Sequence, residues 1–318
     1  MKENKKIQNR KGLDILRGIG ITGIVLYHMF PSVFPGGFLG VPLFFALSGY
    51  LMFITSEYSW KEGNFHIRNY YKKRIVKILP ALFTMVMAVC CYLTLTHSSR
   101  MIGIRKEIGS IFLGYNNWWQ ISRNTSYFSH LAGSSPFTHL WFLAVEIQFY
   151  LLWPFVFLLY KKLCRIFGNK KMCFLFLLLA LISAGKMLFL YTPGGDPSRV
   201  YYGTDTMAFP LLLGIFLGAA GQAWNTFWPS AGKHAGLLFP AFLAALCILF
   251  VTIDGQFQFL YQGGMFFFSL FFACMIILIE KQDTLFRRLP NFPLFSLLGK
   301  KSYGIYLWHY PLIILAFA

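Results

Sequence analysis

Residues 13–31 read LDILRGIGITGIVLYHMFP, an apolar run long enough to cross a bilayer that nevertheless carries Asp14, Arg17 and His28. Ionisable side chains within a membrane span usually face the interior of the helix bundle or a water-filled cavity. Arg17 and His28 are eleven residues apart, so they project from one helical face and stand about 16 Å apart along the axis. Asp14 precedes Arg17 by three residues and is placed to pair with it. This stretch predicts a transmembrane helix with one polar face.

The whole chain has the composition of a membrane protein. Of its 318 residues, 57% are hydrophobic and 13% are charged, and the mean hydropathy is +0.56. Soluble domains are about a quarter charged, so an ordinary soluble enzyme, a disordered protein and a disulfide scaffold are excluded. The six cysteines lie in or beside apolar runs without Cys-x-x-Cys spacing. They predict neither disulfides nor a metal site.

The apolar runs predict an all-α bundle of about nine transmembrane helices, within a range of eight to ten. The backbone must satisfy its own hydrogen bonds in lipid, and continuously apolar runs do this as helices. We expect a single membrane-embedded domain over residues 1–318. The expected spans are 13–31, 37–55, 78–97, 139–160, 172–191, 206–222, 235–253, 261–279 and 302–318.

The distribution of basic residues predicts the orientation. Outside the spans, 22 Lys and Arg lie on the side of the basic tail 1–12 and five lie on the other side. The excess of positive charge marks the cytoplasm, so the N-terminus is expected inside and the loop 98–138 outside, in a multi-pass plasma (inner) membrane protein. The net charge of +18 therefore reflects topology and predicts no nucleic-acid partner. Because no small-residue cleavage site follows, we expect a retained first span rather than a signal peptide.

Two further spans carry polar residues. In HLWFLAVEIQFYLLWP (139–154), His139 and Glu146 are seven residues apart and share a helical face with Tyr150 nearby; SYGIYLWHYPL (302–312) contains Tyr303 and His309. Each is a candidate site residue because intramembrane polar groups are costly. Structural alternatives stay open: a histidine can bond a neighbouring helix, Glu146 can pair with a base, and Arg17 and Lys186 can snorkel to the interface.

A basic cluster, KKRIVKILP (72–80), precedes the third apolar run. Such clusters commonly set topology, but clustered Lys and Arg also bind phosphate. The sequence has no P-loop, no Gly-x-Gly-x-x-Gly after a strand and no His-Glu-x-x-His, so ATPase, dinucleotide-binding and zinc-protease chemistry have no support.

Five stretches occur in the order seen in the acyltransferase 3 family of integral membrane acyltransferases, which the chain resembles over nearly its whole length. This resemblance implies transfer of an acyl group, commonly acetyl, from cytoplasmic acyl-CoA to a hydroxyl, with no permanently bound cofactor. The acceptor is usually a sugar of a cell-surface or exported glycan, sometimes peptidoglycan or an antibiotic. The stretches are LDILRGIGITGIVLYH (13–28), GGFLGVPLFFALSGYLMF (36–53), KKRIVKILP (72–80), HLWFLAVEIQFYLLWP (139–154) and LGKKSYGIYLWHYPL (298–312).

The resemblance also implies roles for particular residues. The family's Arg-x10-His motif matches Arg17 and His28, and its cytoplasmic Arg-x-x-Arg motif falls on Arg74 and Lys77. Lysine keeps the charge there but gives up bidentate phosphate geometry. The family's Trp and Glu in the fourth-span motif match Trp141 and Glu146.

The chain departs from the family pattern in places. Pro42 stands where many members have Asp, and Met207 and Phe209 replace an Arg and an Asp in TDTMAFPLLLG (204–214). Members often have one more span after the HYPL motif, whereas this chain stops at Ala318. Because no extracytoplasmic SGNH-type domain follows, we expect the membrane part to handle the acceptor.

Together these observations predict an acyl-CoA-dependent O-acyltransferase with His28 as general base, since the ordinary pKa of imidazole near 6.5 suits proton transfer. Glu146 orients or polarises a group nearby, and Arg17, Lys73, Arg74 and Lys77 hold the donor nucleotide. Direct transfer and transfer through an acyl-histidine both fit these residues. The other residues expected to line the cavity are Asp14, Tyr27, His139, Trp141, Tyr150, Tyr303 and His309.

Two other classes of function stay open. In a transporter or flippase, the buried Arg, His and Glu would bind substrate or relay protons, but the paired repeats typical of transporters are not visible in the sequence. The chain could also be a non-catalytic partner in glycan assembly. The expected partners are acyl-CoA, a glycan acceptor, the lipid bilayer and glycan-assembly proteins.

Overall fold

The computed structural model describes residues 2–96, 103–128, 135–223, 231–281 and 293–316, and within these ranges every regular element is helical. Each predicted span corresponds to one long helix, which confirms the predicted helical bundle. The long helices are α1 (Lys2–Met29), α2 (Gly40–Lys61), α3 (Ile67–Thr96), α6 (Trp141–Phe167), α7 (Asn169–Leu190), α9 (Phe209–Ala223), α10 (Ala231–Thr252), α11 (Met265–Lys281) and α12 (Pro293–Ala316). Short helices are α4 (Ile104–Phe112), α5 (Asn116–Ser122) and α8 (Ser198–Tyr202), with single turns at Gly37–Leu39, Thr138–Leu140 and Leu260–Gly264.

Several helices extend beyond the apolar runs that predicted them. α1 continues through the basic tail 1–12, and α3 starts at Ile67, so the basic cluster 72–77 is helical. Hydropathy identifies only the part of a helix that lies in lipid. Lys and Arg are good helix formers, so the helix continues past the apolar run. The predicted loop 98–138 contains α4 and α5. Residues 98–102 and 129–134 of that loop, and residues 317–318 of the last predicted span, lie outside the described residues.

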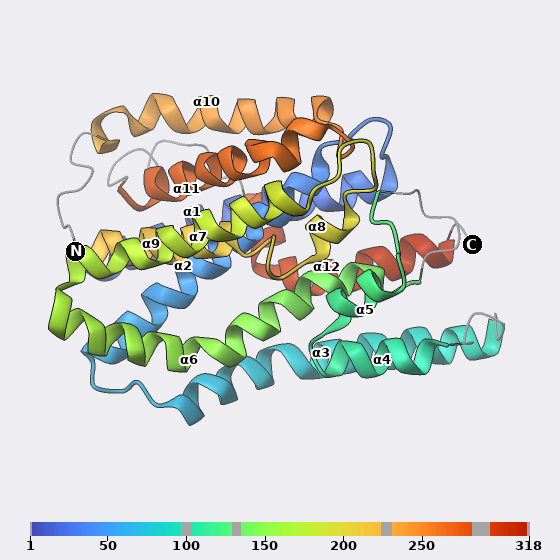
Figure 1. The fold of residues 1–318 in the computed structure, drawn as a ribbon, viewed down its shortest axis with the longest axis horizontal. Coiled ribbons are helices and arrows are strands. Elements are labelled where there is room, and N and C mark those ends of the chain that lie inside the picture. The colour runs from blue at the N-terminus through green and yellow to red at the C-terminus, as the bar shows by residue number, and fades with distance from the viewer. Residues whose placement is uncertain (1, 97–102, 129–134, 224–230, 282–292, 317–318) are drawn as a thin grey trace.

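The long helices lie roughly along one direction, and α4, α5 and α8 lie toward the end away from the N-terminus (Figure 1). Five segments are long and apolar enough to cross a membrane: Gly37–Lys61, Ile67–Thr96, Thr138–Phe167, Asn169–Leu190 and Leu260–Glu280. The most apolar window of the first is 78% buried by protein, whereas that of Asn169–Leu190 is 28% buried. α2 is therefore central, and α7 presents much of its apolar surface outward, as lipid contact requires.

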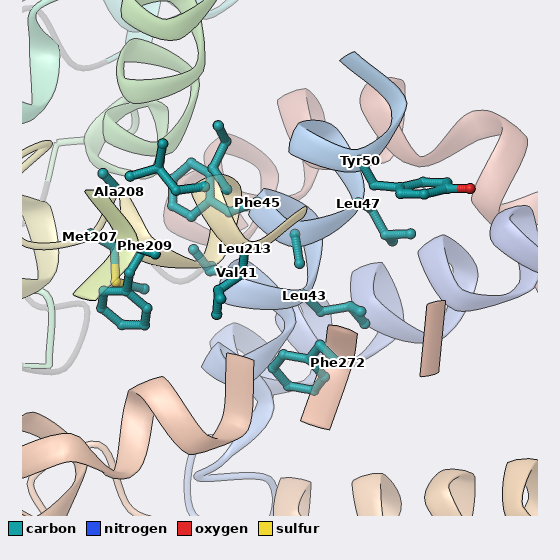
Figure 2. Packing of buried hydrophobic residues seen from close by; sticks show 14 of the residues in the cluster. Val41, Leu43, Phe45, Leu47, Tyr50, Met207, Ala208, Phe209, Leu213 and Phe272 are labelled. Carbon is teal, nitrogen blue, oxygen red and sulfur yellow. The ribbon is translucent and has the colours of Figure 1, made fainter. Parts of the chain in front are cut away.

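The core is centred on the contact between α2 and α9 (Figure 2). Leu43 and Phe45 of α2 are fully buried, as are Phe209 of α9 and Phe272 of α11. At Gly214 an added Cβ would lie 2.0 Å from the Ala46 carbonyl oxygen. Small residues let helix backbones approach closely in membranes, where packing rather than the hydrophobic effect holds helices together.

α1 and α12 approach just as closely. An added Cβ at Gly18 would lie 2.0 Å from the Phe295 carbonyl oxygen, and one at Gly299 would lie 1.7 Å from the Asp14 carbonyl oxygen. Gly18 is adjacent to Arg17, so this contact sets the polar face of α1 directly against α12. The fold thereby places Asp14, Arg17 and His28 at the contact between α1 and α12, which we call the seam, instead of in lipid.

The seam gives a stability prediction. Gly299→Ala places a methyl group inside the α1–α12 contact. We expect it to lower the free energy of unfolding by about 1–3 kcal/mol, the usual cost of overpacking. Gly304→Ala on the same helix is the matched control, because nothing lies within 4 Å of its added Cβ and alanine is the better helix former. Thermal melting in detergent should show a lower Tm for the first variant and an equal or higher Tm for the second. Equal melting of both variants with the parent chain would contradict the described contact.

Candidate active site

One cavity lies between α1, α2, α3, α6 and α12, beside the basic cluster of α3. Its polar lining comes from segments far apart in sequence, which the packing of these five helices brings together. The predicted residues that line it are Arg17, Arg74, Lys77, Glu146, Tyr150 and Tyr303, and Ser48 and Tyr306 join them. With Lys300, four basic groups and one carboxyl therefore share a single cavity.

Glu146 is buried on α6, and its carboxyl accepts a short hydrogen bond from the Ser48 hydroxyl of α2. Ser48 belongs to the small-residue stretch FALSGYL, and the structure gives it a carboxyl partner. Opposite, the Arg74 guanidinium lies 4.5 Å from the ring centroid of Tyr150 and 5.4 Å from that of Tyr70. Cation–π contacts of this kind hold a guanidinium while leaving its N–H donors able to bind another group.

Two other predicted site residues, Asp14 and Lys73, lie near this cavity. Asp14 forms the predicted salt bridge with Arg17, at 3.5 Å between Oδ1 and Nη1. Lys73 lines a neighbouring pocket, to which Arg74 and Lys77 also contribute. The two basic residues thus connect a polar surface pocket with the interior cavity, so an extended anionic ligand could contact both.

The cavity ends at Ile24 and Tyr306, and His28 lies one helical turn beyond Ile24. His28 therefore does not line it, and this cavity does not connect Arg17 with His28. The Tyr306 hydroxyl donates to the His139 carbonyl oxygen at 2.5 Å, which holds the ring at the closed end. The spacing of Arg17 and His28 predicts that they share a helical face, but it carries no information on the aromatic side chain between them.

Beyond the closed end, His28, His139 and His309 form a buried group. The His28 and His309 ring centroids are 5.2 Å apart, and those of His139 and His309 are 5.5 Å apart. A direct contact joins His28 Nδ1 to His309 Nε2 at 3.1 Å. The cost of polar groups in a membrane span predicts that each histidine faces inward, but it does not predict that three segments far apart in the chain bring them together. In the described part of the chain, no set of His, Cys, Asp and Glu is arranged to hold a metal ion.

Aromatic rings surround the histidines. Tyr27 is edge-on to His28 at 5.2 Å and stacks with Tyr127 at 6.0 Å. Trp141 lies 5.0 Å from the Tyr201 ring, so it belongs to this aromatic shell and not to the cavity. Tyr127 and Tyr201 were missed by sequence reasoning because, in a chain that is 19% aromatic, no pattern separates such tyrosines from ordinary packing.

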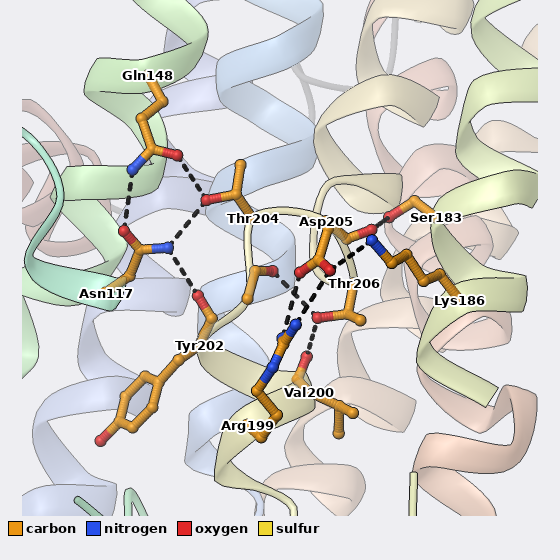
Figure 3. Close-up of polar contacts among 11 residues, drawn as sticks. Asn117, Gln148, Ser183, Lys186, Arg199, Val200, Tyr202, Thr204, Asp205 and Thr206 are labelled. Carbon is orange, nitrogen blue, oxygen red and sulfur yellow. Dashed lines mark hydrogen bonds and ion pairs between the residues drawn. The ribbon is translucent and has the colours of Figure 1, made fainter. Parts of the chain in front are cut away.

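A polar network fastens the short helices to the bundle (Figure 3). Asp205 accepts hydrogen bonds from the two terminal nitrogens of Arg199 at 3.2 and 3.1 Å and pairs with Lys186 at 2.8 Å. The neighbouring Thr204 donates to Gln148 Oε1 at 2.6 Å. The segment that departs from the family pattern at Met207 therefore still ties α6, α7 and α8 together through Thr204 and Asp205, and Lys186 is paired with Asp205.

Burial alone would raise the pKa of Asp205, but the cations of Arg199 and Lys186 reverse the shift and hold its pKa below the ordinary value of 3.8. A carboxyl whose pKa is lowered by folding stabilises the protein above its unfolded pKa, and that contribution is lost as the pH falls through the folded value. The network is accordingly a source of stability at neutral pH.

The comparison with known families identifies the class of protein. The acyltransferase domain family matches residues 10–318, and the chain belongs to that family. Among its relatives, peptidoglycan O-acetyltransferase OatA of Listeria monocytogenes is 37% identical over 309 residues, covering 95% of this chain and 49% of the relative.

Two further relatives are named as putative O-acetyltransferases. Putative peptidoglycan O-acetyltransferase YrhL of Bacillus subtilis is 37% identical over 314 residues, covering 96% of this chain and 49% of the relative. A putative O-acetyltransferase of Staphylococcus aureus is 33% identical over 317 residues, covering 97% and 51%. The chain thus spans about half the length of the curated relatives it matches. No solved structure matches the chain.

Removing the Asp205 carboxylate tests the polar network. Asp205→Asn should lower the Tm at neutral pH because Arg199 and Lys186 lose their counter-charge. The difference from the parent chain should shrink as the pH falls below about 3.8, where protonation removes the same charge. Asp254→Asn is the control, since Asp254 is exposed and only accepts a bond from the Gln256 backbone N–H at 2.8 Å. An Asp205 variant that melts with the parent at neutral pH would refute this role.

Proposed function

We propose that the protein is a membrane-bound O-acetyltransferase that moves an acetyl group from cytoplasmic acetyl-CoA to a hydroxyl of a cell-surface glycan, with His28 as general base. The observation that carries the proposal is the polar face of α1, which sets Arg17 in a cationic cavity and His28 in a buried histidine group about 16 Å further along one seam with α12. Family membership supports acyl transfer, and the names of the relatives support acetyl as the acyl group.

The donor end is the cationic cavity. Coenzyme A carries several phosphate charges, and Arg17, Arg74 and Lys77 supply matching charge in one place, with Lys73 in the adjoining pocket. The 22 to 5 distribution of Lys and Arg supports a cytoplasmic N-terminus, and therefore a donor that enters from the cytoplasm. Glu146 limits the mutual repulsion of these cations and is kept in place by Ser48.

The acyl end is the histidine group. The pantetheine arm extends toward Ile24 and Tyr306, and the thioester reaches His28 once the Tyr306 ring moves aside. The acceptor oxygen attacks the thioester carbonyl while His28 takes its proton; the C–S bond then breaks, and the leaving sulfur receives that proton. General acid–base assistance of this kind contributes typically 10²–10⁴-fold.

The acceptor end faces the other side of the membrane. Two of the relatives, from Listeria monocytogenes and Bacillus subtilis, are named as peptidoglycan O-acetyltransferases, the second as a putative one, and peptidoglycan is a glycan outside the cytoplasm. The tyrosines and tryptophan around His28 offer flat apolar faces and hydroxyl groups, the combination that sugar rings bind. A hydroxyl entering from this side would meet the acyl group at His28 without crossing the cationic cavity.

The role of His28 is tested by His28→Ala in protein reconstituted into vesicles with radiolabelled acetyl-CoA and N-acetylglucosamine-containing glycan fragments. Acetyl transfer should fall by about 10²–10⁴-fold, while binding of acetyl-CoA stays within about twofold because the cationic cavity is intact. Size-exclusion profile and Tm report whether the variant folds. Retained transfer by a folded variant would end the general-base assignment.

The donor site is tested by Arg17→Ala. Losing one charge-assisted contact to phosphate costs about 1.5–3 kcal/mol, so the Kd for acetyl-CoA measured by calorimetry should rise about 10- to 100-fold. Arg165→Ala is the matched control, because Arg165 is an exposed arginine in the last turn of α6 and does not line the cavity. Equal affinity of the two variants would contradict the proposed donor site.

A further inference from the structure

The hydrogen bonds of His309 and His28 fix which of their ring nitrogens carry protons. His309 Nδ1 lies 2.7 Å from the Tyr306 carbonyl oxygen and 3.2 Å from the Ile305 carbonyl oxygen. Carbonyl oxygens only accept hydrogen bonds, so Nδ1 must carry the proton of the ring. Both carbonyls belong to the turn of α12 that precedes His309, so the helix itself sets this tautomer.

The tautomer of His28 follows from that of His309. A neutral imidazole has one N–H and one lone pair, so His309 Nε2 is an acceptor. His28 Nδ1 lies 3.1 Å from it, and a hydrogen bond there requires His28 Nδ1 to donate. The lone pair of neutral His28 is then on Nε2, the ring nitrogen that this contact leaves unengaged.

A positively charged His309 would donate from Nε2 and would require His28 Nδ1 to accept. The surroundings of His309 disfavour that charge. Both rings are buried, at 7% relative exposure each, and a buried charge without a partner is very costly. Among the described residues, no carboxylate bonds to either ring: Asp14 pairs with Arg17, and Glu146 accepts from Ser48. The groups that do face the pair are the imidazole of His139 and the rings of Tyr27, Tyr127 and Tyr310.

We propose that His309 is a positioning residue that holds His28 in the Nδ1–H tautomer, so that Nε2 is the atom that removes the acceptor proton. This inference rests on the proposed role of His28 as base. When His28 Nε2 takes the proton, its Nδ1–H bond to His309 becomes charge-assisted and therefore stronger. His309 thus orients the ring before the reaction and stabilises its charged form during it, without itself changing protonation.

The tautomer can be observed directly in the unmodified protein. Histidine labelled with ¹⁵N, in protein reconstituted into bilayers near pH 8, gives separate signals for protonated and unprotonated ring nitrogens in solid-state NMR. The His28 signals are identified by their loss in His28→Gln. We expect a protonated Nδ1 and an unprotonated Nε2 for His28, with a through-bond or close-contact correlation from His28 Nδ1 to His309 Nε2. A protonated Nε2 on neutral His28 would overturn the proposal.

Two substitutions at His309 separate positioning from packing. His309→Gln can place its amide oxygen where Nε2 lies and still accept from His28, whereas His309→Leu cannot. We expect kcat to fall about 10- to 100-fold in His309→Leu, the usual cost of removing a group that orients a functional histidine. His309→Gln should recover most of that loss, and the KM for acetyl-CoA should stay within about twofold in both. In His309→Leu, the NMR signals should show the Nε2–H form of His28 appearing.

The outcomes separate this inference from the proposed function. If folded His28→Ala retains activity, the general-base proposal fails, and the NMR result still decides the tautomer. If His28→Ala is inactive but the two His309 variants lose activity equally, with the His28 tautomer unchanged, the positioning role is wrong and the base assignment stands. If His309→Leu does not fold, the tautomer in the unmodified protein still decides.

Discussion

The close contact between α1 and α12 is the constraint on which the rest of the structure depends. Gly18 and Gly299 let the two backbones meet where any side chain would collide with a carbonyl oxygen. Arg17, Asp14 and His28 could not lie in a lipid-facing helix without a large cost in free energy. The seam removes that cost by giving these groups partners within the protein, and it joins the first helix of the chain to the last. The proposed catalytic geometry is a consequence of this contact.

The seam also divides the site into two environments. On one side of Tyr306 lies a cavity with four basic side chains and a carboxyl, suited to a phosphate-rich donor. On the other side, three histidines lie among aromatic rings, suited to proton transfer away from bulk water. A single polar pocket would bind the donor nucleotide and the acceptor in the same place. In the proposed function, this separation lets one end bind the charged donor while the other end carries out the reaction.

Much of this arrangement could be predicted from the sequence. The spans followed from hydropathy, and the shared face of Arg17 and His28 followed from their spacing of eleven residues. The Asp14–Arg17 pair followed from a spacing of three. These are local relations, set by the geometry of a single helix. The five ordered motifs added the family, which the match over residues 10–318 confirms.

What could not be predicted depends on contacts between distant segments. His28 and His309 are separated by 281 residues in the chain, and no pattern within either helix specifies the register of their crossing. The hydrogen bond from Ser48 to Glu146 joins two helices that are far apart in sequence, so neither stretch alone predicts it. Tyr306 lies in the last span, and nothing in the sequence of that span indicates that its ring lies at the end of the cavity. Trp141 matched a family motif, yet its position in the aromatic shell depends on Tyr201 and Tyr202, which come much later in the sequence.

The central claim is that one seam connects a donor cavity to a buried imidazole. The most direct measurement is a cryo-EM structure of the protein with a non-hydrolysable thioether analogue of acetyl-CoA. The account predicts the phosphates beside Arg17, Arg74 and Lys77, the Tyr306 ring turned away from its hydrogen bond with the His139 carbonyl oxygen, and the acetyl carbon within contact of His28 Nε2. An analogue bound elsewhere, or bound in the cavity with Tyr306 unmoved and the acetyl group a helical turn from His28, would contradict it.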